Sequence, residues 1–75
     1  MFWVYILRDK LTEKLYIGST ADLERRLDEH RIKKPSYRLI RKEMRSDKQS
    51  ALMREKYLKS GNGRRYLKNL LVSKS

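Results

Sequence analysis

The stretch that decides the fold runs from Leu15 to His30 and reads LYIGSTADLERRLDEH. Its first three residues, Leu15-Tyr16-Ile17, are aliphatic or aromatic and predict a short strand. Gly18 then lets the backbone turn. The rest changes to a helical period and predicts a helix over about 21–30. The stretch is therefore a strand, a glycine turn and a helix in immediate succession.

The start of this helix carries capping chemistry. Ser19 and Thr20 supply hydroxyls where the helix is predicted to begin, and Asp22 adds negative charge to its first turn. Leu23 and Leu27 are four residues apart, so we expect them to form its buried stripe.

Two polar side chains share one flank of the same helix. Arg26 and His30 are also four residues apart and lie beside the apolar stripe. The preceding strand brings Tyr16 to the same region. A phenol, a guanidinium and an imidazole gathered around one turn indicate a functional site.

In these residues the chain resembles the GIY-YIG nuclease domain, and the small stand-alone bacterial members in particular. The resemblance rests on Val4-Tyr5-Ile6, on Tyr16-Ile17-Gly18, on Arg26 and His30, on Glu55 in a later helix, and on the segment 61–64. It covers nearly the whole chain, with these residues in order and at matching spacing. The first motif departs from the family pattern, because Trp3 stands at its glycine and Val4 at its isoleucine.

Bulk properties bound the class of protein. At 75 residues, 1–75 is expected to be one domain with a small core. The absence of cysteine favours a reduced, intracellular setting, and we expect the bacterial cytoplasm or nucleoid. The longest apolar run, Met1–Leu7, is too short to span a membrane and lacks the flanks of a signal peptide. No membrane partner is therefore expected.

The charge balance points to a polyanion. The chain has 20 Lys and Arg against 9 Asp and Glu, which gives a net charge of +11. A high net charge can simply keep a protein in solution. Nucleic acid is the commonest partner for such a surface, and the resemblance to GIY-YIG nucleases implies that it is DNA.

The first third of the chain predicts a hairpin. Residues 2–7 are apolar on both faces and predict a central strand, and 8–13 form a short polar connection. Residues 14–18 return as the second strand. Antiparallel pairing across this connection is expected to bring Tyr5 close to Tyr16.

The middle of the chain predicts a basic loop, a strand and a helix. Residues 31–36 form the loop, and 37–44 alternate imperfectly and predict a charged edge strand. Ser46 and Gln49 fit a capping box for a helix over 47–60.

The last segment predicts a third helix. Gly61 suits the end of the second helix, and Asn62 suits the cap of a helix over 63–71, followed by a frayed tail at 72–75. Its expected buried stripe consists of Tyr66, Leu67, Leu70 and Leu71. The predicted fold class is α+β, a three-stranded antiparallel sheet flanked by three helices in the order ββαβαα.

Glu55 is the informative carboxylate, because it lies on or beside the apolar face of its helix. The ordinary interpretation is an ion pair with Lys59 or Arg54. The resemblance implies instead that Glu55 is the metal-binding glutamate. A single carboxylate suits one Mg²⁺ ion, or Mn²⁺, that also uses water and substrate phosphate as ligands.

The resemblance also implies roles for the other site residues. Arg26 would bind a phosphate oxygen, although a surface pair with Asp22 is the alternative. His30 would assist proton transfer or bind phosphate, although helix-end histidines are often surface residues. Tyr5 and Tyr16 would supply the general base and position water or phosphate; spacing does not say which does which.

The predicted activity is a metal-dependent DNA endonuclease with a one-metal mechanism. The expected catalytic set is Tyr5, Tyr16, Arg26, His30 and Glu55, converging on one basic cleft. Six further cations are expected to bind DNA phosphates: Arg25, Lys33, Lys34, Arg64, Arg65 and Lys68. Specificity would come from DNA structure, a partner protein or a homodimer. The alternatives are a non-catalytic nucleic-acid-binding module and a degenerate domain that binds protein.

Overall fold

The computed structural model describes the backbone of residues 1–72 and the side chains of residues 1–69. Its elements are β1 (Phe2–Asp9), β2 (Leu15–Thr20), α1 (Leu23–Lys33), β3 (Tyr37–Arg45), α2 (Lys48–Lys59) and α3 (Gly61–Val72). The predicted order ββαβαα and the three-stranded antiparallel sheet are confirmed. The strand order is β2-β1-β3, so β1 is central and β3 is an edge, as expected.

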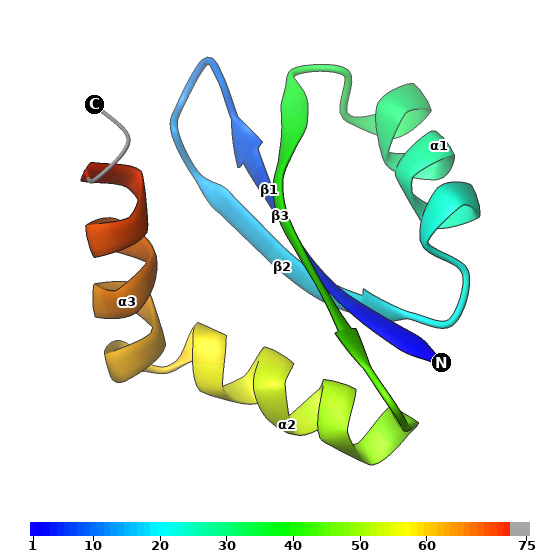
Figure 1. Ribbon diagram of the computed structural model, residues 1–75. Helices are drawn as coiled ribbons and strands as arrows, with labels where there is room; N and C mark the ends of the chain where they lie inside the picture. The colour runs from blue at the N-terminus through cyan, green and yellow to red at the C-terminus, as the bar shows by residue number, and fades with distance from the viewer. Residues whose placement is uncertain (73–75) are drawn as a thin grey trace.

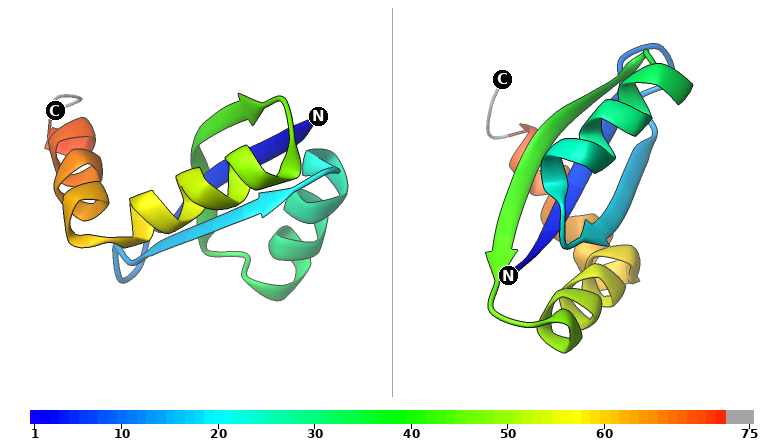
Figure 2. Two further views of the ribbon diagram at one scale, coloured as in Figure 1. Left: turned by 90° about the horizontal axis from the view of Figure 1, so that it is seen from below. Right: turned by 90° about the vertical axis from the view of Figure 1, so that its right-hand side faces the viewer.

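The two faces of the sheet divide the side chains of β1 by their alternation. Val4 and Ile6 belong to the core that α2 and α3 cover, whereas Tyr5 and Leu7 point to the opposite face, toward α1. Figure 1 shows α1 on one side of the sheet and α2 and α3 on the other. Figure 2 shows α2 running alongside β2.

The core lies on the α2 and α3 side. Its buried members are Val4, Ile6, Ile17, Ala51, Leu58 and Leu67. Tyr66 packs against this cluster, while the side chains of the expected stripe residues Leu70 and Leu71 lie outside the described residues. The α1 side is thinner, because no described side chain of α1 is buried. Leu23 and Leu27 are only half-buried, so the expectation of a buried stripe on α1 was wrong.

The first helix begins and ends later than predicted. Ser19 and Thr20 belong to β2, and the N-cap is Asp22, whose side chain accepts a hydrogen bond from the backbone N–H of Arg25. The helix continues through Lys33 instead of ending at residue 30. Three residues of the predicted loop are helical, because Pro35 restricts the residue before it and leaves the preceding turn free to form.

The hairpin and the edge strand also differ in detail from the prediction. β1 continues to Asp9, whose carboxylate accepts hydrogen bonds from the N–H of Leu11 and the hydroxyl of Thr12. On the other side of β1, the register with β3 shifts between Ile6 and Leu7. This irregularity explains the imperfect alternation of β3, where Ile40 is an extra residue that packs on the core.

The two caps of α2 were predicted one residue away from where they lie, and α3 begins two residues earlier than predicted. Asp47, not Ser46, caps α2 by accepting a hydrogen bond from the N–H of Ser50. Ser60, not Gly61, is the C-cap of α2, and its carbonyl accepts a hydrogen bond from Arg64 in the first turn of α3. Asn62 is therefore inside α3 and does not cap it. Ser60 alone connects α2 to α3, so this connection needs no glycine in the left-handed conformation.

Val72 is the last residue whose backbone the structure describes. The predicted tail at 72–75 lies outside the described residues except for Val72, which ends α3. Among the described helices, none combines the length and apolar character that a membrane crossing requires.

Candidate active site

Three ring side chains from three elements meet on the α1 face of the sheet. The Tyr5 hydroxyl lies 3.2 Å from Nε2 of His30. The ring centroids are 6.2 Å apart for Tyr5 and Tyr16 and 4.8 Å apart for Tyr16 and His30. The structure therefore brings Tyr5, Tyr16 and His30 into one cluster, and the expected approach of the two tyrosines is confirmed.

Gly18 makes room for this cluster. Tyr5 pairs with Gly18 across β1 and β2, so the phenol ring lies over a position that has no side chain. A Cβ atom added to Gly18 would lie 2.6 Å from the Tyr5 hydroxyl oxygen and 3.2 Å from the Tyr16 ring. The glycine is therefore required by close packing, not by an unusual backbone angle, since no described glycine has a positive φ.

The protonation states of the cluster follow from burial and nearby charge. Burial, followed by the influence of Tyr16, raises the pKa of Tyr5 to about 12, against an opposing effect of Arg26. Burial, with the positive charges of Lys34 and Arg26, lowers the pKa of His30 below 6.5. At neutral pH the phenol thus keeps its proton and the imidazole is uncharged. In the His30 tautomer that carries its proton on Nδ1, Tyr5 donates the hydrogen bond and Nε2 accepts it.

Two cations flank the rings. Nζ of Lys34 lies 4.7 Å from the centroid of the Tyr16 ring. Arg26 extends from α1 and pairs with Glu29 at 3.7 Å, one turn onward, rather than with Asp22. This pair is long, at 3.7 Å, and the Arg26 side chain is 44% exposed, so Arg26 remains available to an anion.

Glu55 reaches the same sheet edge from the opposite face. Its Oε1 accepts a hydrogen bond of 2.7 Å from the Ser19 hydroxyl, and its Oε2 accepts one of 2.8 Å from Nζ of Lys59. Burial acts to raise the pKa of Glu55, but the hydrogen bonds from Lys59 and Ser19 outweigh it and lower the pKa below its usual value. Glu55 is therefore an ionised carboxylate whose predicted ion pair with Lys59 is present.

The edge strand β2 lies between the two parts of this arrangement. Gly18 is beneath the Tyr5 hydroxyl, and the next residue, Ser19, holds Glu55 on the other face. The negative charge of Glu55 acts on the pKa of Tyr5, as does the positive charge of Arg26. The expected catalytic side chains thus surround residues 18–19 of β2, although no single described cavity is lined by all of them.

The six expected phosphate contacts divide into four groups by their position. Lys34 lies at the ring cluster, and Arg25 lines a groove of about 340 Å³ with Arg26 and Ser19. Arg64 lines a second groove with Tyr16 and Lys59. The remaining three, Lys33, Arg65 and Lys68, are exposed, with no described contact to the ring cluster or to Glu55.

Comparison with known protein families identifies the family of this chain. A family model described as the GIY-YIG catalytic domain matches residues 1–68. The chain belongs to the GIY-YIG family. GIY-YIG domains are nuclease domains that act on DNA and generally use divalent metal ions. Searches of curated proteins and of solved structures gave no significant match to this GIY-YIG chain.

The residues around Glu55 suit a divalent ion. Among the described residues there is no group of three or more His, Cys, Asp or Glu that could hold a metal, so a GIY-YIG ion here would depend on one carboxylate. The ammonium group of Lys59 already occupies a cation position at Oε2 of Glu55. Because the Lys59 side chain is 54% exposed, it can leave at small cost. The donor set therefore fits a divalent ion that completes its shell with water and phosphate.

Sequence reasoning missed two interactions at this candidate site, one made by Ser19 and one made by Lys34. Ser19 was expected to cap a helix, yet it lies in β2 and orients Glu55. Strand alternation could have revealed this, because Ile17 and Ser19 share the face that α2 covers. Lys34 was expected only to bind phosphate, but it also lowers the pKa of His30.

Proposed function

We propose that this chain is a metal-dependent DNA endonuclease that hydrolyses a phosphodiester bond at the edge of β2, using one divalent ion. The observation that carries the proposal is the hydrogen bond between Tyr5 and a neutral His30. It links a phenol to a proton acceptor beside a cationic, solvent-facing edge.

In the proposed reaction Tyr5 and His30 move the proton of the attacking water. The water oxygen bonds to phosphorus while its proton passes to the Tyr5 oxygen, and the Tyr5 proton passes to Nε2 of His30. The bond from phosphorus to the leaving oxygen breaks, and that oxygen takes a proton from solvent. The raised pKa of Tyr5 makes a free phenolate scarce, so a concerted transfer to His30 is the favoured path.

The remaining residues bind and orient the substrate in this proposal. Arg26 binds a non-bridging oxygen of the phosphate, because its guanidinium stays charged and forms paired hydrogen bonds. Tyr16, half-buried beside Tyr5, positions the water. Glu55 holds Mg²⁺ or Mn²⁺, with Ser19 orienting its carboxylate. When bound there, the ion supplies Lewis-acid stabilisation of the charge on the phosphate and the leaving oxygen.

A nicking assay on duplex, flapped and branched DNA tests the proposal. Cleavage should require Mg²⁺ or Mn²⁺, stop with EDTA and disappear in Glu55→Gln, while DNA binding in EDTA persists. Lys56→Ala, an exposed change one position along α2, is the matched control and should still cleave. Binding without cleavage in either metal on every substrate would overturn the proposal and favour a non-catalytic binding module.

A further inference from the structure

A groove beside the proposed site is not used by the reaction described above. It has a volume of about 470 Å³ and lies between β2, α2 and α3. Its lining consists of Lys14, Leu15, Tyr16, Ile17, Leu58, Lys59, Arg64 and Leu67. This volume falls in the range of about 300–1,000 Å³ that bound small molecules occupy.

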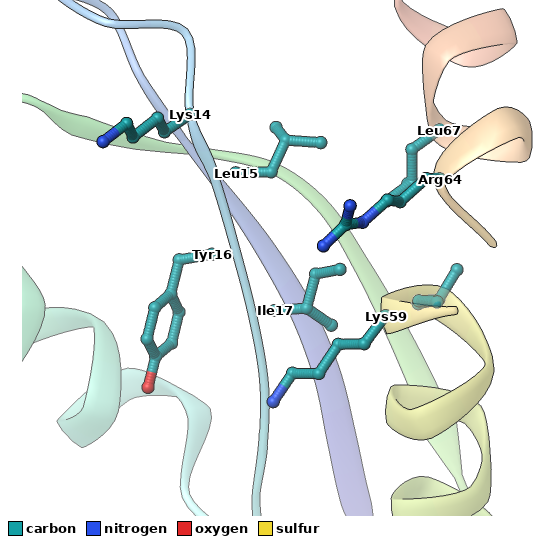
Figure 3. A pocket seen from close by; sticks show the side chains of 8 residues that line it. Lys14, Leu15, Tyr16, Ile17, Lys59, Arg64 and Leu67 are labelled. Atoms are coloured by element: carbon teal, nitrogen blue, oxygen red, sulfur yellow. The ribbon is translucent and has the colours of Figure 1, made fainter. Parts of the chain in front are cut away.

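The groove combines an apolar floor with a cationic rim. Half-buried Leu15 supplies apolar surface to the floor, and the core residues Ile17, Leu58 and Leu67 lie buried beneath it. Figure 3 shows the charged ends of Lys59 and Arg64 reaching from the helices toward β2. None of the described residues that line the groove is acidic, so its charge is complementary to an anion.

The lining fits an unpaired nucleotide better than a duplex. A duplex presents phosphates and sugars on its outside and keeps the faces of its bases stacked, so it would leave an apolar floor uncovered. An unpaired nucleotide offers both a flat base for the floor and a phosphate for the rim. Unpaired bases are also the ones that proteins can take into a pocket at the lowest cost.

The groove adjoins the proposed active site at Glu55. Lys59 lines the groove and also binds Glu55. Tyr16 is also a lining residue, but its ring points across β2 toward the ring cluster on the α1 face (Figure 3). A nucleotide in the groove would therefore be a neighbour of the phosphate held near Glu55.

We infer that this groove binds an unpaired nucleotide adjacent to the cleaved phosphate, so that the preferred substrate is DNA with unpaired bases at the cleavage site. The inference rests on the proposed function for its biological use, but the binding itself does not require cleavage. Arg64 holds the phosphate of that nucleotide, and the base packs on the floor beside Leu15.

The test is fluorescence polarisation in EDTA, at one salt concentration, with two labelled DNAs. One is a duplex, and the other is the same duplex with a short central bulge. The wild-type protein should bind the bulged DNA about tenfold more tightly. A bulge whose bases are replaced by abasic sites keeps the backbone but should lose about fivefold of this preference.

Arg64→Gln and Arg65→Gln form a matched pair, because each removes one cation from neighbouring exposed positions of α3. Both should weaken binding to all DNA through the loss of charge. Only Arg64→Gln should reduce the ratio between bulged and duplex DNA, because Arg65 is rotated about 100° from it. Leu15→Ser should remove the difference in affinity between the intact and the abasic bulge. Circular dichroism checks that this variant is folded.

Three results would overturn the inference that this groove binds an unpaired nucleotide. They are equal affinity for intact and abasic bulges, the same ratio of bulged to duplex affinity in both arginine variants, or a dimer that Arg64→Gln dissociates. The last would mean that a second copy covers the groove. These outcomes are separate from the proposed function. A preference for bulged DNA without cleavage in Mg²⁺ would support nucleotide binding by the groove and refute the proposed hydrolysis. Equal cleavage of duplex and bulged DNA, with equal affinity for intact and abasic bulges, would support hydrolysis and refute nucleotide binding by the groove.

Discussion

The Tyr5 hydroxyl lies 3.2 Å from Nε2 of His30, although 25 residues separate them in the chain. The contact joins the central strand to the last turn of α1 and pairs the phenol with one ring nitrogen of His30. It also distinguishes the two tyrosines, because no such hydrogen bond joins the described Tyr16 side chain to His30.

Tyr5→Phe should abolish most cleavage while preserving the fold. The phenyl ring fills the same buried space, and only the hydroxyl is lost. Loss of the proton path should lower the single-turnover rate by about 10²–10⁴-fold. DNA affinity in EDTA should stay within about twofold. Tyr57→Phe, at an exposed tyrosine of α2, is the control and should cleave normally. Equal rates for both variants would contradict the assignment.

Cleavage should weaken in mild acid. The pKa of His30 is lowered below 6.5, chiefly by burial and also by Lys34 and Arg26. His30 accepts a proton only when neutral, so the rate should be full at pH 7 and fall as pH drops through the lowered pKa. Single-turnover rates between pH 5 and 8 measure the midpoint, which is expected below 6.5. A rate that rises toward acid would mean that His30 acts as a cation on the phosphate.

Lys59→Ala should strengthen metal binding at Glu55. The ammonium of Lys59 lies 2.8 Å from Oε2 and competes with any ion for that oxygen. Titration with Mn²⁺, followed by electron paramagnetic resonance, should give up to about fivefold tighter binding than in Lys56→Ala. Glu55→Gln should lose the site. Unchanged affinity in Lys59→Ala would show that the ion does not use Oε2.

Glu43 should control stability in acid. Arg54 forms two hydrogen bonds with its carboxylate, at 2.8 and 3.1 Å, and Arg41 forms another at 2.9 Å. The hydrogen bonds from Arg54 lower the pKa of Glu43 from 4.5 to about 2. Burial opposes this change, and the hydrogen bond from Arg41 adds to it. Its stabilisation is therefore full above pH 4.5 and is lost as pH falls toward 2.

Glu43→Gln should thus reduce the free energy of unfolding at pH 7 by about 2–3 kcal/mol. It should also flatten the decline in stability between pH 4.5 and 2, where the wild-type carboxylate becomes protonated. Urea unfolding followed by circular dichroism at several pH values measures both effects. Glu24→Gln, at an exposed position of α1, should leave the decline intact.

The two glycines at the α2–α3 junction should respond in opposite directions to alanine. A Cβ at Gly63 would lie 2.2 Å from the Tyr57 carbonyl oxygen and 2.4 Å from Cα of Leu58, so backbone would have to move. Gly63→Ala should cost about 3 kcal/mol or more. Gly61 has no heavy atom within 4 Å of such a Cβ, and Gly61→Ala should stabilise by about 0.5–1 kcal/mol. Thermal melts compare them.

The hydrophobic periodicity and the order of the motifs along the chain were sufficient to predict the element order and the sheet. They also placed Tyr5 next to Tyr16. The caps were less predictable, because Ser46 and Asp47 are both good N-caps and only the direction of the chain after β3 selects Asp47. For the same reason Ser19 and Thr20 were predicted to cap a helix, whereas they lie in β2.

The arrangement around β2 needed the three-dimensional fold. Nothing in the local sequence says that Glu55 approaches from the opposite face to Tyr5, since this depends on which side of the sheet α2 packs. The direction of the pKa change also required burial to be known. A phenol beside cations suggests a lowered pKa, yet burial of Tyr5 raises it to about 12.

β2 is an edge strand, so one side of its backbone has no strand partner in the described sheet. Such an edge is a template for the strand of another molecule, and aggregation through it would bury residues 18–19. Lys59 and Arg64 surround this edge with positive charge. Two copies brought edge to edge would set these cations against one another, so the charges that attract a polyanion also protect the strand from self-association. Variants that neutralise several of them should lose solubility along with affinity for DNA.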